Sequence, residues 1–387
     1  MSGCRCRRAT TLGALIDTIA EFVQFLCHAL LGALDMKLRF GYTLATASVA
    51  TLVALSSPGW AADLNALVWC DHSDPNLLKP FEDANGIKVN VKEFGGTGAG
   101  FAIVEQSQPG DWDVMVIDSI DVPRGVAKGL FEPLADEQLP LADIFPEVAL
   151  DSKTKVDGKR YGVTEKFGYN TIGYNKSKVD VADMQSLAAL TDPKYKGRIA
   201  IYDYYLPVVG MAAMSIGKKT SELTEADLPA LKDVLLKMKA NAKAVTDVAA
   251  SQTALATGEA DILVGGGEWV TAGISKENPD LDFSIPREGA VLWSQSLAMF
   301  KDSKNKDLAM KFIQYVMSPE GQARLATSSC YWGMPANTKA ALSDEQKSTL
   351  RFAEQADFLK RAQPYPAPDE ALDKKLQDLW TEMLQTP

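Results

Sequence analysis

The sequence has 387 residues, of which 46% are hydrophobic and 23% charged, a composition typical of a globular protein with two or three domains. The formal net charge is −10, so a nucleic-acid-binding surface is not expected as the main function. A mild acidic excess is compatible with a cationic ligand, but it mainly supports solubility.

Residues 36–61 have the pattern of a secretory signal peptide. Lys37 and Arg39 form the charged start, Tyr42–Leu55 is an uncharged apolar stretch, and small residues precede a cleavage site after Ala61. The apolar stretch is short for a membrane span, and no lipobox ending in cysteine follows. We therefore expect export followed by cleavage near Ala61.

Residues 1–35 precede this complete signal, although a signal peptide is normally N-terminal. The pattern favours Met36 as the true start and residues 1–35 as the product of a misplaced start codon. The alternative is a genuine amphipathic extension.

Removal of residues 1–61 leaves Cys70 and Cys330 as the cysteines of the mature chain, and two cysteines in an oxidising compartment can pair. His72 is then the only histidine, which excludes a multi-histidine metal site. We expect neither a metal nor a cofactor.

The mature chain opens with alternating strand and helix patterns, which predict a parallel sheet with crossover helices. The expected elements are strands at 64–69, 87–94 and 113–117 and helices at 76–85 and from the glycine-rich segment 95–100 to about 106. Asp118 follows the third strand directly.

Segment Tyr161–Asn175 lies between this region and a second one that begins near Val179. It contains three glycines and four aromatic residues, and its two runs Tyr161–Thr164 and Thr171–Tyr174 predict strands. Because glycine tolerates large backbone changes, the segment predicts a hinge.

The second region repeats the alternation and ends in helices. The expected strands are 199–202, 261–264 and 283–286, with a return crossing at 289–293, and the expected helices are 208–216, 224–242, 251–257, one from 268, 306–317, 320–326, 344–360 and 369–384.

The hinge segment resembles the inter-domain crossing of bacterial periplasmic spermidine/putrescine-binding proteins. Tyr161-Gly162-Val163 and Ile172-Gly173-Tyr174-Asn175 match that family's motif in order and spacing. The resemblance implies a type II periplasmic-binding-protein fold, in which two α/β domains are joined by a two-strand hinge with a ligand cleft between them. The expected division is 62–164 plus 292–335 for domain one and 165–291 plus 336–387 for domain two.

The resemblance also implies a function. The protein is expected in the periplasm as the substrate-binding component of an ABC importer, not as an enzyme. It would capture a small polar nitrogenous solute by hinge closure and deliver it to a membrane permease with its ATPase, without binding nucleic acid. A monomer is expected.

Ligands in open α/β sheets bind beyond the carboxyl ends of the strands, and each domain of a two-domain clamp supplies one wall. The candidate residues follow strands, line the crossings or lie in a late loop. They are Trp69, His72, Gly96, Thr97, Gly98, Asp118, Ser119, Lys166, Asp203, Tyr204, Gly267, Glu268, Trp269, Trp293, Gln295 and Trp332.

Several positions depart from the family pattern for a polyamine. Gln295 and Val264 stand where the family has an acid and a tryptophan, Tyr204 and Pro207 replace an acidic pair, and Asp118 replaces a serine. A long polyamine is therefore not the expected ligand.

Two alternatives remain open. The glycine-rich segments 95–100 and 265–267 each precede a helix N-terminus, which favours an anion, and Lys166 could add charge. A zwitterionic or anionic solute, such as an amino-acid derivative or an aminophosphonate, fits this pattern. A secreted hydrolase or a sensor subunit on the same clamp is the other alternative, although no Gly-x-Ser-x-Gly or His-Glu-x-x-His motif is present.

Overall fold

The computed structural model describes residues 63–386. The predicted signal peptide and the upstream segment 1–35 lie outside the described residues. Within the described part, no helix combines the length and the apolar character needed to cross a membrane.

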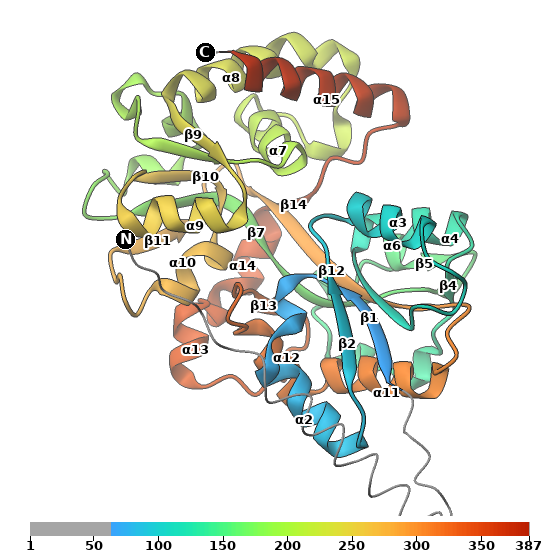
Figure 1. Cartoon of the computed structure of the whole chain (residues 1–387). Coiled ribbons are helices and arrows are strands. Elements are labelled where there is room, and N and C mark those ends of the chain that lie inside the picture. The colour runs from blue at the N-terminus through green and yellow to red at the C-terminus, as the bar shows by residue number, and fades with distance from the viewer. Residues whose placement is uncertain (1–62, 387) are drawn as a thin grey trace, which may run out of the picture. The chain divides into compact units, whose positions relative to one another are not determined.

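The predicted α/β architecture is confirmed. Twelve of the described strands form one large mixed sheet, and β5 and β6 form a separate two-stranded sheet (Figure 1). The main strand order is β2-β1-β3-β12-β7-β10-β8-β9. The principal strands are β1 Leu64–Val68, β2 Val89–Glu93, β3 Val114–Asp118, β7 Val163–Asn175, β8 Ile199–Tyr202, β9 Ala242–Thr246, β10 Ile262–Gly266, β11 Leu281–Ser284 and β12 Ala290–Phe300. Shorter ones are β4 Phe131–Glu132, β5 Lys155–Val156, β6 Lys159–Arg160, β13 Met334–Pro335 and β14 Ala362–Pro364.

Several helices connect parallel strands, such as α2 (Pro75–Asn85) between β1 and β2, and helices lie on the faces of the sheet (Figure 1). They are α2 Pro75–Asn85, α3 Thr97–Glu105, α4 Val122–Ala127, α5 Pro146–Ala149, α6 Asp151–Thr154, α7 Tyr205–Ser215, α8 Leu228–Asn241, α9 Val248–Thr257, α10 Glu268–Ile274, α11 Lys306–Met317, α12 Pro319–Ala326, α13 Asp344–Thr349, α14 Gln355–Arg361 and α15 Glu370–Gln385.

The strands β7 and β12 run through both halves of the sheet. They pair antiparallel with each other, with Trp293 opposite Gly168. The first part of β7 also pairs with β13, and its last part pairs with β10 and β11. The two short strands predicted in this segment are therefore one continuous strand of 13 residues. Lys166 pairs with Gln295 of β12 and Thr164 pairs with Ser296, so Glu165 lies at a bulge in the ladder between them.

The glycines of β7 serve a purpose other than the predicted backbone freedom. Gly168 and Gly173, like Gly162 just before β7, are absent from the residues with positive φ. A Cβ on Gly168 would lie 1.7 Å from Glu268 Oε1 and 2.5 Å from the Trp293 ring. Gly168 is thus required for close packing between β7, β12 and α10.

Two main apolar clusters divide the core. The first contains the side chains beside β1, β2, α11 and α12, and the second contains those beside β8, β10, α7 and α15. Leu350 and Phe358 belong to the first cluster, although the expected division assigned their segment to domain two.

The expected helix 344–360 is interrupted between α13 and α14. Arg351 has φ 51°, a left-handed conformation that ends α13, and the Gln355 side chain donates to the Leu350 carbonyl at 3.0 Å. Neither glycine nor proline marks this break, so the sequence gives no local signal for it.

Candidate ligand-binding site

A cavity of about 600 Å³ lies where the carboxyl ends of several strands converge. Segments following β1, β2, β3, β8 and β9 contribute to it, together with β7 and β12. Its lining residues are Trp69, Cys70, Glu93, Phe94, Gly95, Gly96, Asp118, Asn170, Tyr202, Asp203, Tyr204, Asp247, Val248, Trp269, Trp293, Gln295, Tyr331 and Tyr365.

Eight aromatic side chains line the cavity, and several of them pack against one another. Tyr202 and Trp269 have ring centroids 5.3 Å apart, and Tyr204 and Tyr365 have centroids 5.6 Å apart. Trp293 adds a further edge contact with Tyr331. Such rings can stack on an apolar ligand or attract an ammonium group to their faces.

The charged residues in this lining are all acidic: Glu93, Asp118, Asp203 and Asp247. Three of them are exposed, and two of these already have local partners. Asp247 accepts from the Ala250 N–H at 2.9 Å, and Asp203 accepts from Trp380 Nε1 at 3.3 Å.

Asp118 differs because it is buried, with only 3% of its surface exposed. Thr97 Oγ1 donates to its carboxylate at 3.2 Å, and no described Lys, Arg or His forms an ion pair with it. Burial raises the pKa of Asp118 to about 7, the nearby charge of Asp121 adds to this effect, and the Thr97 hydrogen bond opposes it. A cation beside Asp118 would favour its charged form.

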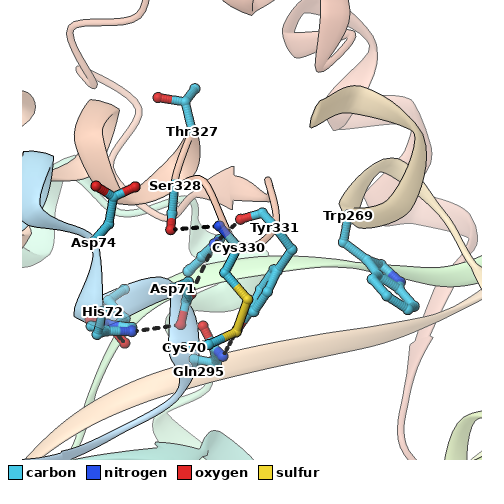
Figure 2. Close-up of polar contacts among 12 residues, drawn as sticks. Cys70, Asp71, His72, Asp74, Trp269, Gln295, Thr327, Ser328, Cys330 and Tyr331 are labelled. Atoms are coloured by element: carbon cyan, nitrogen blue, oxygen red, sulfur yellow. Dashed lines mark hydrogen bonds and ion pairs between the residues drawn. A yellow bond between two sulfur atoms is a disulfide. The ribbon is translucent and has the colours of Figure 1, made fainter. Parts of the chain in front are cut away.

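A second group of charges lies fully buried beside the cavity, and we call Asp71, His72, Glu165 and Lys166 the buried charge cluster. His72 Nδ1 is 2.9 Å from Asp71 Oδ1, and His72 Nε2 is 2.8 Å from Glu165 Oε1. Lys166 Nζ donates to Asp71 Oδ2 at 2.9 Å. Figure 2 shows the contact between Asp71 and His72.

The pKa values of the cluster members shift in different directions. Burial lowers the pKa of Lys166 and raises that of Glu165, although Asp71 opposes the first shift and His72 opposes the second. Burial acts against charge, but Lys166 and His72 hold the pKa of the Asp71 carboxyl well below its usual range. Burial also acts against a charged His72, yet Glu165 and Asp71 raise its pKa to about 10. Asp71 is therefore a carboxylate that pairs with both His72 and Lys166.

Tyr331 and a disulfide connect this cluster to the cavity. Lys166 Nζ donates to the Tyr331 carbonyl at 3.1 Å and lies 4.1 Å from the centroid of its ring. Gln295 Nε2 donates to the Tyr331 hydroxyl at 2.5 Å. Cys70 and Cys330, the neighbours of Asp71 and Tyr331, are joined by a disulfide with a Cα–Cα distance of 5.9 Å (Figure 2).

The structure brings half of the predicted ligand residues to the cavity. Those at the cavity are Trp69, Gly96, Asp118, Asp203, Tyr204, Trp269, Trp293 and Gln295. Those elsewhere are His72, Thr97, Gly98, Ser119, Lys166, Gly267, Glu268 and Trp332.

Most residues of the second set have identifiable partners in the protein. His72 and Lys166 belong to the buried charge cluster, and Thr97 supports Asp118. Ser119 Oγ is hydrogen-bonded to Ser296 Oγ at 2.8 Å. Gly98 is exposed on α3, and the Trp332 ring packs beside Gly273.

The segment before α10 is not arranged as an anion site. A Cβ on Gly267 would lie 2.2 Å from the Tyr169 carbonyl oxygen, so Gly267 serves close packing on β7. The Glu268 carboxylate accepts from the Tyr169 N–H at 3.0 Å, and burial raises its pKa to about 8. An acidic side chain therefore occupies the place expected for a bound anion.

Sequence reasoning missed several lining residues, among them Phe94, Asn170, Tyr202, Asp247 and Tyr365. Tyr202 ends a predicted strand and could have been named by the strand-end rule. Asp247 follows β9, which was missed because Ala242 was assigned to the preceding helix. Tyr365 reaches the cavity from a C-terminal segment that no pattern connects with it.

Comparison with known proteins identifies the family. Residues 76–354 match the model of the family described as bacterial extracellular solute-binding protein. The spermidine/putrescine-binding periplasmic protein of Escherichia coli K12 is 23% identical over 312 residues, covering 79% of this chain and 88% of that protein.

Solved structures agree on the fold. A putative spermidine/putrescine ABC transporter protein from Listeria monocytogenes is 27% identical, with a TM-score of 0.72 covering 84% of this chain and 99% of that one. A periplasmic binding protein from A. tumefaciens R10 in complex with agropinic acid is 22% identical, with a TM-score of 0.63 covering 84% and 99%. The chain thus has the two-domain periplasmic-binding-protein fold and belongs to the family of bacterial extracellular solute-binding proteins.

Proposed function

We propose that this protein is the periplasmic substrate-binding component of an ABC importer and that it binds a small solute carrying an ammonium group. The observation that carries the proposal is Asp118, a buried carboxylate at the cavity with no cationic partner among the described residues. Relatives whose names give spermidine, putrescine and cadaverine as what they bind support an amine as the solute class.

The remaining cavity chemistry suits such a ligand. The buried Asp118 carboxylate is poorly solvated, and an ammonium group beside it would form a charge-assisted hydrogen bond with it. Rings such as Tyr202 and Trp269 would hold the carbon atoms of the solute and attract the cation. Asn170 and Gln295 add amide groups, so a solute that also carries a carbonyl or carboxylate remains compatible with the site.

Binding would occur by closure of the two halves of the sheet about β7 and β12, which both halves share. The closed, loaded form would then dock on a membrane permease that works with an ATPase. Export with cleavage near Ala61 and a monomeric state complete the proposed function.

Isothermal titration of the purified protein with n-butylammonium, 1,4-diaminobutane, γ-aminobutyrate and glycine betaine tests this function. At least one ammonium-bearing solute should bind saturably, and Asp118→Asn should weaken it roughly 100-fold, because truncating one member of a buried charge pair costs about 2–5 kcal/mol. Glu93→Gln is the matched control, since Glu93 is an exposed acid of the same lining. Equal affinity in Asp118→Asn and wild type would exclude Asp118 as the cation partner.

A further inference from the structure

The buried charge cluster contains a complete binding arrangement for an alkylammonium group, and the chain itself fills it. The Lys166 ammonium donates to the Asp71 carboxylate at 2.9 Å and to the Tyr331 carbonyl at 3.1 Å. It also lies 4.1 Å from the centre of the Tyr331 ring. A carboxylate, a carbonyl and an aromatic face are the groups that bind primary ammonium ions.

This arrangement adjoins the cavity. Tyr331 contacts Lys166 and also lines the cavity, as does Gln295, whose amide donates to the Tyr331 hydroxyl. A Cβ on Gly333 would lie 2.6 Å from Lys166 Cε and 2.8 Å from the ring of Trp293, another lining residue. The Lys166 side chain therefore lies directly behind the cavity wall.

The same edge of the sheet thus holds two buried carboxylates with different partners. Asp118 meets the Thr97 hydroxyl, and Asp71 meets His72 and Lys166. The Lys166 side chain ends in four methylene groups and an ammonium, which is n-butylammonium attached to the backbone. Its covalent tether gives it a high effective concentration at Asp71, and a free amine cannot displace it easily.

We propose that Lys166 is a specificity-determining residue that fills an ammonium subsite at Asp71 and Tyr331, so that a solute ammonium is accepted at Asp118 but not at Asp71. This inference depends on the proposed function, in which the cavity binds an amine. A diamine could not place its second ammonium at Asp71, because the Lys166 side chain already fills the space beside Asp71 and Tyr331.

Chemical rescue tests whether the Asp71 arrangement is an ammonium subsite. Lys166→Ala removes the tethered ammonium and leaves a space of similar length. We expect n-propylammonium at millimolar concentration to restore at least half of the thermal midpoint that this variant loses, and to leave the wild type unchanged. Equal shifts in wild type and variant would overturn the subsite. If Lys166→Ala does not accumulate folded, its refolding yield with n-propylammonium or with sodium chloride at equal ionic strength is the readout, and equal yields would also overturn it.

Selectivity tests whether Lys166 closes this subsite to the solute. Titrations compare the affinity ratio of 1,4-diaminobutane to n-butylammonium in three proteins. Lys166→Ala should raise this ratio at least tenfold over wild type, whereas Lys166→Met, which fills the space without charge, should not. An unchanged ratio in Lys166→Ala, or an equal rise in Lys166→Met, would contradict the proposal.

The two tests separate this inference from the proposed function. If wild type binds none of the amines while n-propylammonium still rescues Lys166→Ala, the proposed amine cavity fails and the ammonium subsite stands. If wild type binds n-butylammonium and neither rescue nor a change in the ratio is seen, the inference about Lys166 fails and the proposed function stands.

Discussion

Asp71 and Asp118 occupy comparable places and have opposite electrostatic surroundings. Asp71 follows β1 and Asp118 ends β3, the neighbouring parallel strand, and both are buried. Asp71 pairs with His72 and Lys166, which depress its pKa, whereas Asp118 has one hydroxyl partner and a pKa raised to about 7. Their difference indicates that Asp71 contributes to the folded state of the empty protein and that Asp118 weakens it until a cation arrives.

Removal of the cation from Asp71 should have the largest effect on stability. Lys166→Met leaves the buried Asp71 carboxylate with His72 as its remaining partner, and we expect a loss of about 3–5 kcal/mol. Denaturant unfolding of the apo protein measures this loss. Lys237→Met is the control, because Lys237 forms an exposed pair with Asp233 that contributes about 0.5 kcal/mol. If Lys166→Met lost no more stability than Lys237→Met, the conclusion that the Asp71 pairs stabilise the empty protein would be wrong.

Removal of the disulfide beside Asp71 should cause the second-largest loss of stability. Cys70→Ser opens a link between residues separated by 260 positions, and loss of such a link costs about 2–5 kcal/mol. Unfolding of wild type in oxidising and reducing buffer should reproduce the difference. Cys330→Ser is the matched variant and should give the same loss, because either change removes the same bond.

Asp118→Asn should instead stabilise the empty protein, by up to about 4 kcal/mol at pH 8, because about three pKa units separate the folded from the unfolded carboxyl. The folded-state pKa is raised to about 7 from an unfolded value of about 4, so the stability that Asp118 contributes is complete below pH 4. It is lost as the pH rises from about 4 through 7. The gain from Asp118→Asn should therefore be absent at pH 4 and full at pH 8. Thermal unfolding of wild type and variant at both pH values measures this gain. An equal gain at pH 4 would show that it does not come from the Asp118 charge.

The same titration should make amine binding pH-dependent, which is the smallest effect. A solute whose ammonium stays charged should lose up to about tenfold in affinity for each pH unit below 7, because Asp118 must release its proton first. Titration of n-butylammonium between pH 5 and 8 measures the slope. In Asp118→Asn the remaining weak binding should show no such slope.

The sequence alone located Asp118, Trp69 and Trp293, because strand ends and the two crossings can be recognised from local patterns. The sequence suggested that Lys166 contacts the ligand, because it shows no partner for this lysine nearby. In the structure Lys166 pairs with Asp71, which lies 95 positions earlier in the chain. A contact between residues so far apart in the chain leaves no local sequence pattern. Tyr365 was missed for the same reason.

The expected fold class and the parallel strands followed from hydrophobic periodicity, but β9 and the break between α13 and α14 did not. In both cases tertiary contacts decide the backbone conformation. Residues 242–246 become a strand by pairing with β8, and Arg351 ends α13 by adopting a left-handed conformation while donating to the Phe283 carbonyl.

The position of β12 in the sheet has a consequence for the order in which the chain folds. This strand lies between β3 and β7, yet it spans Ala290–Phe300 in a chain of 387 residues. The two halves of the sheet cannot join until about three quarters of the polypeptide has been synthesised. Because such distant pairings slow folding, the joining of the two halves should be a late step, although β1, β2 and β3 can pair with one another before β12 is made.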